Sequence, residues 1–287
     1  MTSTLACTFE STSRVSAGSG ALHYHDHGDG DPLVMLHGSG PGVSGWANFR
    51  NTIPAFADYR VLVPDMPGFG QSPAPEPFDA PYTKLAAEAV VQLLDELGVE
   101  RIDLVGNSMG GGVASRMALD HPGRIRRLVL MGPGGLAINL LTPRPSEGMR
   151  RLFAFNAQPD REHLVDWLRS MVSDVSLLTD DLIDERMANA TAPGAIEWSR
   201  RLFAAQTDPA LQDAVPLWAR AGEITHPTLL LWGRDDRVIP VESGLFAARH
   251  LPRAELHIFD RCGHWVMIER REAFNGVVRE FLERPAS

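Results

Sequence analysis

The sequence predicts an α/β fold in which a mainly parallel sheet carries helices on both faces, with a helical segment inserted between two strands. Short apolar runs of strand length alternate along the chain with segments of helical periodicity. The runs are apolar at nearly every position, which is typical of parallel strands buried on both faces. The alternation stops once, where residues 139–215 contain helical patterns and no strand pattern.

Six apolar runs are expected to form the strands. In chain order they are Leu33–His37, Val61–Pro64, Ile102–Val105, Leu128–Met131, Thr228–Trp232 and Glu255–Phe259. Three further segments have the apolar spacing of helices, namely Tyr82–Leu97, Ser108–Leu119 and Arg270–Leu282.

Residues 139–215 are expected to form a cap. The amphipathic patterns EGMRRLFAF, REHLVDWLRSMV and TDDLIDERMANA follow one another there, and Thr179 is placed to cap the last of them. The alternative is that these helices pack directly on the sheet, but so long a stretch without a strand favours a cap. We therefore predict a core domain of residues 1–138 and 216–287, with the cap inserted in it.

Composition disfavours several classes of function. The chain of 287 residues has a net charge of −9, which disfavours nucleic acid as a partner, and an anionic substrate would need a local cation or neutral donors. Its two cysteines, Cys7 and Cys262, lie far apart and fit a reducing compartment. The N-terminus has no signal-peptide pattern, and the longest charge-free stretch, Leu128–Pro143, is broken by glycine and proline. We expect a cytoplasmic protein without a membrane span.

The segment Gly106-Asn107-Ser108-Met109-Gly110 matches G-x-S-x-G between an expected strand and an expected helix. In that context a sharp turn lifts the serine hydroxyl above the sheet, and small flanking residues let the strand and the helix approach closely. The alternative is a glycine-rich turn with an incidental serine. Candidate partners later in the chain favour a nucleophile.

A nucleophilic serine needs a base and a group that orients the base, and in this architecture an acid and then a histidine follow the serine. Asp235 and Asp236 follow the fifth run, and His264 follows the sixth. Because both loops leave the carboxyl ends of strands, we expect them at the same sheet edge as Ser108. Residue chemistry alone leaves the choice between the two aspartates open, since either could pair with a neighbouring arginine.

Two glycine- or histidine-rich segments have competing interpretations. HGSGPG, at residues 37–42, follows the first run and is expected to donate a backbone N–H to an oxyanion, together with the N–H of Met109. A phosphate-binding loop is the alternative, but the segment lacks the required endings. HYHDH, at residues 23–27, looks like a metal cluster because alternate histidines share a strand face. A polar hairpin arm is preferred, and no metal site is predicted.

These motifs together resemble the α/β-hydrolase fold, and more narrowly the meta-cleavage product hydrolases, which hydrolyse C–C bonds in the bacterial degradation of aromatic compounds. The resemblance covers nearly the whole chain from about His25. The asparagine before the serine and the tryptophan after the histidine separate this group from ordinary esterases. The resemblance rests on HGSGPGVSGWANFR, DMPGFGQS, GNSMGG, LVLMGPGG, TPRPSEGMRRL, WGRDDRVIP and ELHIFDRCGHWVMIE.

The resemblance implies a role for each matching position. The catalytic triad would be Ser108, Asp236 and His264, so the resemblance selects the second of the adjacent aspartates. Many members have glycine where this chain has serine in the glycine-rich loop, a change that keeps the backbone donor. The backbone donors to the oxyanion would be Ser39, Gly40 and Met109. The dienol–carboxylate end of a substrate would be contacted by Asn48, Asn107, Ser176, Arg186 and Trp265.

The resemblance also implies a reaction. A dienol of the 2-hydroxy-6-oxo-hexa-2,4-dienoate type would be ketonised and then cleaved by water into 2-hydroxypenta-2,4-dienoate and a carboxylic acid, without a metal or organic cofactor. Whether the serine attacks the ketone or assists water is open. The apolar cap favours a hydrophobic C6 substituent, with candidate contacts Phe153, Phe155, Trp167, Met171 and Trp198.

The family implies a homo-oligomer. Two other functions compete with a C–C bond hydrolase. One is a carboxylesterase of the same fold. The other is a non-catalytic binding protein, against which the complete triad argues.

Overall fold

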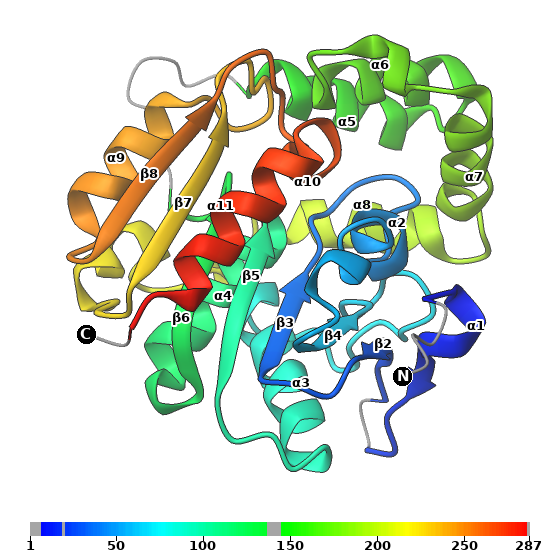
Figure 1. Ribbon diagram of the computed structural model, residues 1–287. Coiled ribbons are helices and arrows are strands. Elements are labelled where there is room, and N and C mark those ends of the chain that lie inside the picture. The colour runs from blue at the N-terminus through cyan, green and yellow to red at the C-terminus, as the bar shows by residue number, and fades with distance from the viewer. Residues whose placement is uncertain (1–6, 19–20, 137–144, 286–287) are drawn as a thin grey trace.

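The centre of the molecule is an eight-stranded sheet, shown in Figure 1 as part of the computed structural model, which describes residues 7–18, 21–136 and 145–285. The strand order is β1-β2-β4-β3-β5-β6-β7-β8. β2 runs antiparallel to both of its neighbours, whereas the strands from β3 to β8 are parallel. The strands are Ser13–Val15 (β1), His23–His27 (β2), Pro32–Leu36 (β3), Arg60–Pro64 (β4), Ile102–Asn107 (β5), Ile125–Met131 (β6), Thr228–Gly233 (β7) and Ala254–Phe259 (β8).

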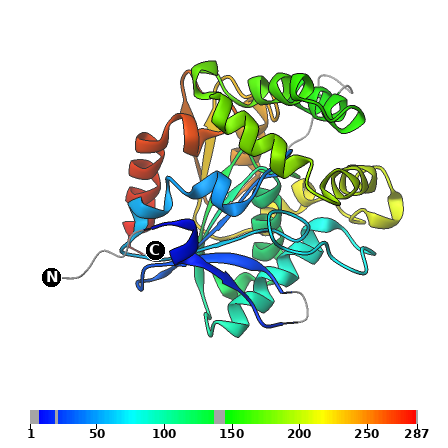
Figure 2. The ribbon, with the colours of Figure 1, turned by 90° about the vertical axis from the view of Figure 1, so that its right-hand side faces the viewer.

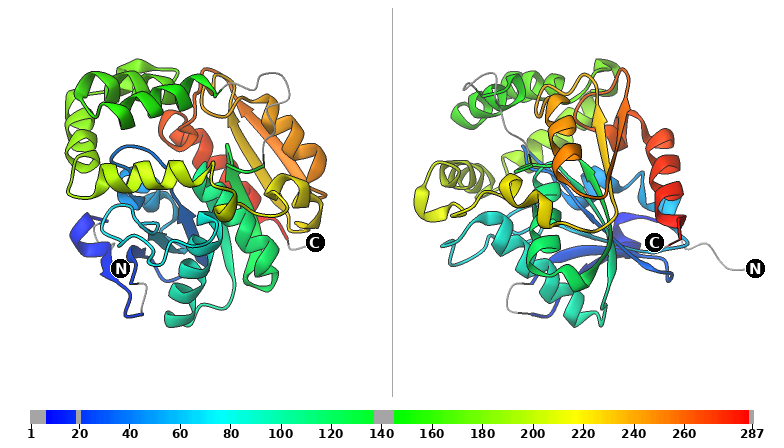
Figure 3. Two further views of the ribbon diagram at one scale, coloured as in Figure 1. Left: turned by 180° about the vertical axis from the view of Figure 1, so that it is seen from behind. Right: turned by 90° about the vertical axis from the view of Figure 1, so that its left-hand side faces the viewer.

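The helices of the core are Phe9–Thr12 (α1), Gly45–Phe49 (α2), Tyr82–Glu96 (α3), Met109–Asp120 (α4), Glu242–His250 (α9), Val266–Glu269 (α10) and Arg271–Glu283 (α11), with 3-10 turns at Ile53–Phe56 (η1), Pro122–Arg124 (η2) and Leu217–Glu223 (η5). They cover both faces of the sheet, as Figures 2 and 3 show. α3, α4 and α9 pack against Val34 and Leu104, while α2 and α11 pack on the side of Leu33 and Val105. Successive strand residues point to opposite faces, so a strand covered on both faces must be apolar throughout.

The predicted α/β fold is confirmed, and all six predicted strands are present as β3 to β8. The polar segment His23–His27 is strand β2, which pairs with β1 as a hairpin and with β4. Two of its histidines are buried and partnered, since His23 Nδ1 lies 2.7 Å from Asp65 Oδ2 and His25 Nδ1 lies 2.8 Å from Thr12 Oγ1. Among the described residues, no group of His, Cys, Asp or Glu side chains could hold a metal ion.

Among the described residues, four helices and three 3-10 turns, the last of which is η5, separate β6 from β7 in the chain. The N-caps of the first three helices are Ser146, Asp160 and Thr179, and Thr179 accepts the Leu182 N–H as the sequence predicts. These four helices lie together beyond the edge at which β3, β7 and β8 end, as Figure 1 shows. They are Glu147–Ala157 (α5), Arg161–Met171 (α6), Asp180–Ala190 (α7) and Ala195–Ala205 (α8), with turns at Val175–Leu177 (η3) and Pro209–Leu211 (η4).

The predicted start of the cap, at residue 139, lies outside the described residues. Within the described ranges, no helix is long and apolar enough to cross a membrane.

Strand β5 and helix α4 meet at a very close approach. A Cβ on Gly106 would lie 2.5 Å from the Gly110 carbonyl oxygen, and a Cβ on Gly110 would overlap the Leu36 carbonyl oxygen of β3. Only glycine fits where two backbones come so near. The two glycines therefore set the angle at which the chain turns between strand and helix.

We expect Gly110→Ala to lower the free energy of unfolding by about 1–3 kcal/mol, because the new methyl group forces α4 away from the backbone of β3. Gly276→Ala is the matched control. Gly276 is an exposed residue of α11 with open space around it, so alanine should add about 0.5–1 kcal/mol through helix propensity. Urea unfolding followed by circular dichroism measures both. Equal effects of the two substitutions would contradict the packing argument.

Candidate active site

Ser108 occupies a strained turn between β5 and α4. Its φ of 52° and ψ of −114° are unusual for a residue with a side chain, and such a conformation costs about 1–3 kcal/mol. Neighbouring backbone holds it in place, since Ser108 donates its N–H to the Met131 carbonyl at 2.8 Å and accepts the Gly134 N–H at 2.8 Å. The turn is fixed from the adjacent strand β6, so the hydroxyl has a defined direction.

Asp236 and His264 form a buried pair. His264 Nδ1 lies 2.7 Å from Asp236 Oδ2, and the two side chains are 1% and 2% exposed. The other oxygen, Asp236 Oδ1, accepts the N–H groups of Val238 and Ile239 at 2.8 and 2.9 Å. A carboxylate held by two backbone donors and aimed at Nδ1 favours the tautomer with the proton on Nδ1, which leaves the Nε2 lone pair available.

The two adjacent aspartates have different environments. Asp236 faces His264, whereas Asp235 is exposed and accepts the Ser173 hydroxyl of the segment after α6 at 2.9 Å. The choice that residue chemistry left open is therefore resolved by the backbone after β7, which turns one carboxylate inward and the other outward.

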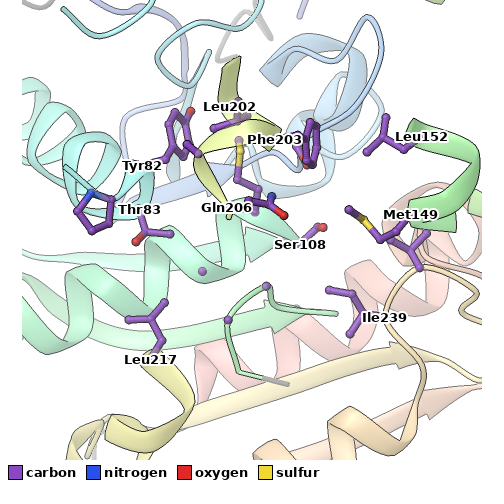
Figure 4. A pocket seen from close by; sticks show the side chains of 18 of the residues that line it. Tyr82, Thr83, Ser108, Met149, Leu152, Leu202, Phe203, Gln206, Leu217 and Ile239 are labelled. Atoms are coloured by element: carbon purple, nitrogen blue, oxygen red, sulfur yellow. The ribbon is translucent and has the colours of Figure 1, made fainter. Parts of the chain in front are cut away.

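A cavity of about 500 Å³ lies between the carboxyl edge of the sheet and α5, α6 and α8. Ser108 and His264 both border it, so the nucleophile candidate and the base candidate share one space. Figure 4 shows Ser108 near its centre, with Met149, Leu152 and Ile239 on one side and Leu217 and Thr83 on the other. Other lining residues are Ser39, Tyr82, Met109, Trp167, Met171, Leu202, Phe203, Gln206, Asp213, Trp218 and Val238.

The glycine-rich loop approaches Ser108 from β3. Ser39 and Met109 border the cavity, and a Cβ on Gly38 would lie 3.2 Å from the Ser108 Cβ. Met109 is the first residue of α4, where backbone N–H groups have no partner within the helix. Gly40 has a φ of 140° and packs against the Trp167 ring, which leaves no room for a side chain.

His37 fixes the shape of this loop. Its Nδ1 donates to the Gly38 carbonyl at 2.7 Å, and its Nε2 accepts the Met66 N–H at 2.9 Å. Burial lowers the pKa of His37, which favours the neutral ring that this donor–acceptor pattern requires.

Four of the predicted contacts for the polar end of a substrate are buried side chains, although none of the four borders the cavity itself. Arg186 is 2% exposed, Asn48 4%, Asn107 1% and Trp265 3%. The Arg186 guanidinium lies 5.0 Å from the centre of the Trp265 ring, and Trp265 packs edge-on against Trp167, which borders the cavity. Asn107 Nδ2 reaches the Met131 carbonyl at 3.4 Å.

Several polar atoms of this group have no hydrogen-bond partner among the residues that the structure describes. They are Nη1 of Arg186 and both Nδ2 and Oδ1 of Asn48. Burial lowers the pKa of Arg186 to about 10, so the side chain is still a cation at pH 7. Buried polar groups are normally hydrogen-bonded, and a buried cation is normally paired. Unpartnered atoms of both kinds therefore indicate a site that binds an anionic or polar ligand.

The structure does not bring Ser176 to this site. Ser176 is exposed in the turn η3, where its N–H binds the Asp174 carboxylate, and it does not border the cavity. The chain after α6 turns outward here, and a contact between Ser176 and a substrate stays a prediction. Among the predicted C6 contacts, Trp167 and Met171 border the cavity. Three others do not, namely Phe153, Phe155 and Trp198.

Glu269 joins the His264 loop to the segment that follows α6, a role that the sequence did not reveal. Its carboxylate accepts the Gly263 N–H of the His264 loop and also the N–H groups of Ser173 and Asp174, at 2.7 and 2.9 Å, just after α6. His264 itself donates its backbone N–H to the Met171 carbonyl at 2.8 Å. The position of the imidazole therefore depends on where the end of α6 lies.

Gly132 is a second position that sequence reasoning missed. It ends β6 with a φ of 44°, and a Cβ there would lie 3.1 Å from the His264 ring and 3.3 Å from Asp236 Oδ2. Its place in the quoted segment LVLMGPGG gave a signal of a turn, but the spacing along the chain does not show that the turn supports the histidine.

Residues 31–271 match the family described as alpha/beta hydrolase fold, which agrees with the order of strands and with the serine at the strand–helix turn. The chain is 42% identical, over 263 residues and 91% of both proteins, to the 2-hydroxy-6-oxo-6-phenylhexa-2,4-dienoate hydrolase of Burkholderia cepacia. It is 41% identical, with the same coverage, to the 2-hydroxy-6-oxononadienedioate/2-hydroxy-6-oxononatrienedioate hydrolase of Comamonas testosteroni.

The structural comparison points the same way. A meta-cleavage product hydrolase of Pseudomonas fluorescens superposes with a TM-score of 0.84 and 34% identity, covering 94% of this chain and 97% of that one. Similarity of this extent, over nearly the whole length of the proteins compared, means that the chain belongs to the meta-cleavage product hydrolases, a family of enzymes within the α/β-hydrolase fold.

We expect Glu269→Gln to lower the kcat/KM for substrate hydrolysis by about tenfold. The glutamine side chain has one acceptor oxygen for three backbone N–H groups, and its own NH₂ group would face at least one of these donors. Glu272→Gln is the control, since Glu272 is exposed in the first turn of α11. Steady-state kinetics and thermal unfolding of both variants make the comparison. A normal kcat/KM for Glu269→Gln would show that the carboxylate does not position His264.

Proposed function

We propose that the protein hydrolyses the C5–C6 bond of a dienol of the 2-hydroxy-6-oxo-hexa-2,4-dienoate type, giving 2-hydroxypenta-2,4-dienoate and a carboxylic acid in the degradation of aromatic compounds. The observation that carries this proposal is the buried Arg186, whose Nη1 has no protein partner. A neutral ester offers no charge to such a cation, whereas the dienol carries a carboxylate at C1. The names of the relatives at 41–42% identity support the same substrate class.

In this proposal His264 transfers protons and Asp236 orients it. The 2.7 Å contact between the two side chains supports a neutral imidazole with its free Nε2 available to the Ser108 hydroxyl. Ser108 then attacks the C6 ketone or assists a water molecule that does so. The backbone N–H groups of Met109 and of the loop at Ser39 and Gly40 stabilise the oxyanion that forms at C6.

Cleavage of a C–C bond leaves an electron pair on carbon, and the proposed site disperses it. The substrate first moves the proton of its 2-hydroxyl group to C5, so that C2 becomes a ketone conjugated with the C3–C4 double bond. When the C5–C6 bond breaks, the electron pair passes through this system to the C2 oxygen as an enolate. Arg186, Asn48 and Asn107 supply a cation and amide donors for this charge, with Trp265 beside them.

The proposal includes the architecture around the site. Residues 139–215 act as a cap on a core of residues 1–138 and 216–287, and α6 contributes Trp167 and Met171 to the cavity. We further propose that the enzyme works in the cytoplasm as a homo-oligomer. The edge strand β8, with the Ile258 side chain 41% exposed, supports contact with a second copy.

A panel of yellow dienols with methyl, isopropyl, carboxyethyl or phenyl at C6 tests the reaction. We expect the wild-type enzyme to bleach the visible absorbance of at least one of them, and Ser108→Ala to lower kcat by about a thousandfold or more because the nucleophile is lost. Chromatography identifies the dienoate and the acid. If the wild-type enzyme cleaves nitrophenyl esters and bleaches no dienol, the protein is a carboxylesterase and the proposal fails.

Replacement of Arg186 tests how the site uses its buried cation. We expect Arg186→Met to lower kcat/KM for the dienol by about 100-fold, while the melting temperature stays equal or rises, because an apolar side chain of similar length relieves an unpaired buried charge.

Arg161→Met is the control, since Arg161 is an exposed arginine of α6 that pairs with Asp180 at 2.7 Å and does not border the cavity. Its kcat/KM should stay within about threefold of wild type. A clear loss of stability in Arg186→Met, with normal kinetics, would assign Arg186 to the fold instead of the substrate.

A further inference from the structure

The cavity beside Ser108 has an acidic group at a distance from the nucleophile. Asp213 borders the cavity, and its Oδ2 pairs with Nη2 of Arg116. Arg116 lies on α4 two turns beyond Ser108, about 12 Å along the helix axis. If C6 of a substrate lies at Ser108, the group attached to C6 occupies the remaining space of the cavity, which Asp213 borders.

The pair does not present a positive charge to the cavity. Arg116 is 5% exposed, and a second carboxylate, that of Asp120, lies 3.3 Å from its Nη1. Asp120 also lies 3.7 Å from Nη1 of Arg220, so two guanidinium groups are paired with the two carboxylates, and of these four groups only Asp213 borders the cavity. None of the described residues that line the cavity is a lysine or an arginine. A third carboxylate entering here would meet the carboxylate of Asp213, while the cations behind it do not border the cavity.

A large part of the cavity wall is apolar. Met149, Leu152 and Ile239 lie on one side of Ser108 in Figure 4, and Val238 and Trp167 also line the cavity. A carboxylate placed against these side chains would lose its hydration without gaining a partner. The Asp213 carboxylate and these apolar side chains are therefore both unfavourable neighbours for an anion, the first through charge and the others through desolvation.

We propose that Asp213 is a specificity-determining residue, which makes the cavity select dienols whose C6 substituent is an uncharged alkyl or aryl group and reject those whose substituent ends in a carboxylate. This inference rests on the proposed C–C bond hydrolysis. The two ends of the substrate are then treated oppositely. The C1 carboxylate meets the buried cation Arg186, while a second carboxylate at the C6 end meets Asp213.

The test compares kcat/KM for C6-phenyl, C6-isopropyl and C6-carboxyethyl dienols in three proteins. The wild-type enzyme should prefer the phenyl and isopropyl dienols over the carboxyethyl dienol by at least about tenfold. Asp213→Asn removes the charge that faces the cavity and should raise the ratio of the carboxyethyl to the phenyl kcat/KM by about tenfold. Asp120→Asn is the matched control, since it removes the other partner of Arg116 outside the cavity and should leave the ratio unchanged.

Product inhibition of the wild-type enzyme gives a second measurement that does not depend on the folding of a variant. Isobutyrate and benzoate should inhibit at concentrations at least about tenfold lower than succinate, the acid released from the carboxyethyl dienol. Equal turnover of the carboxyethyl and phenyl dienols by wild type, or a ratio that Asp213→Asn does not move, overturns the role of Asp213. Failure to bleach any dienol overturns the proposed function itself, so the two failures are distinguishable.

Discussion

The close approach of β5 and α4 is the constraint on which the rest of the site depends. Two glycines let the strand and the helix come together, and the chain can then turn at Ser108 only through a positive φ. That turn is held by the backbone of β6. Because β6, β7 and β8 are successive parallel neighbours in the sheet, their carboxyl ends bring Gly132, Asp236 and His264 to one edge. The strain at the serine is therefore balanced by a sheet whose register places each partner within reach.

The His264 loop and the end of α6 are joined by several hydrogen bonds. The Met171 carbonyl accepts the N–H of His264, and Glu269 accepts N–H groups from the His264 loop and from the segment after α6. Any motion that lifts the end of α6 would also displace the backbone of the histidine. The same helix supplies Trp167, which packs on Gly40 of the glycine-rich loop and on Trp265. The oxyanion loop, the base and the wall of the cavity thus share one support.

Most strands of the sheet could be predicted from the sequence. The features that could not be predicted depend on contacts between residues far apart in the chain. Buried parallel strands can be recognised in a sequence because nearly every position is apolar, and this pattern predicted β3 to β8. Strand β2 was harder to recognise, since its polar pattern does not suggest burial. Its buried histidines are hydrogen-bonded to Asp65 and Thr12, which lie elsewhere in the chain. The choice of Asp236 over Asp235 came from family resemblance, as did Ser176, and the chain places Ser176 on an exposed turn. Contacts across long sequence distances, such as that of Glu269 with Ser173, leave no local pattern.

The charged groups near Arg186 differ from those near Asp213. Arg186 is buried among aromatic and amide side chains, with its nearest acidic neighbour, Glu185, engaged by Arg50 at the surface. An uncompensated buried cation destabilises a fold, so its presence is understandable only if a ligand supplies the missing anion. Beside the cavity, the Arg116 and Arg220 cations are paired with Asp120 and Asp213, and neither cation borders the cavity. In the proposed reaction, a substrate with one carboxylate therefore pairs its anion with Arg186 and keeps its uncharged C6 substituent in the cavity. The reversed orientation would place the substrate's carboxylate beside Asp213 and leave Arg186 unpaired. Because that orientation is disfavoured, the proposed site fixes the reacting ketone relative to Ser108 before the reaction begins.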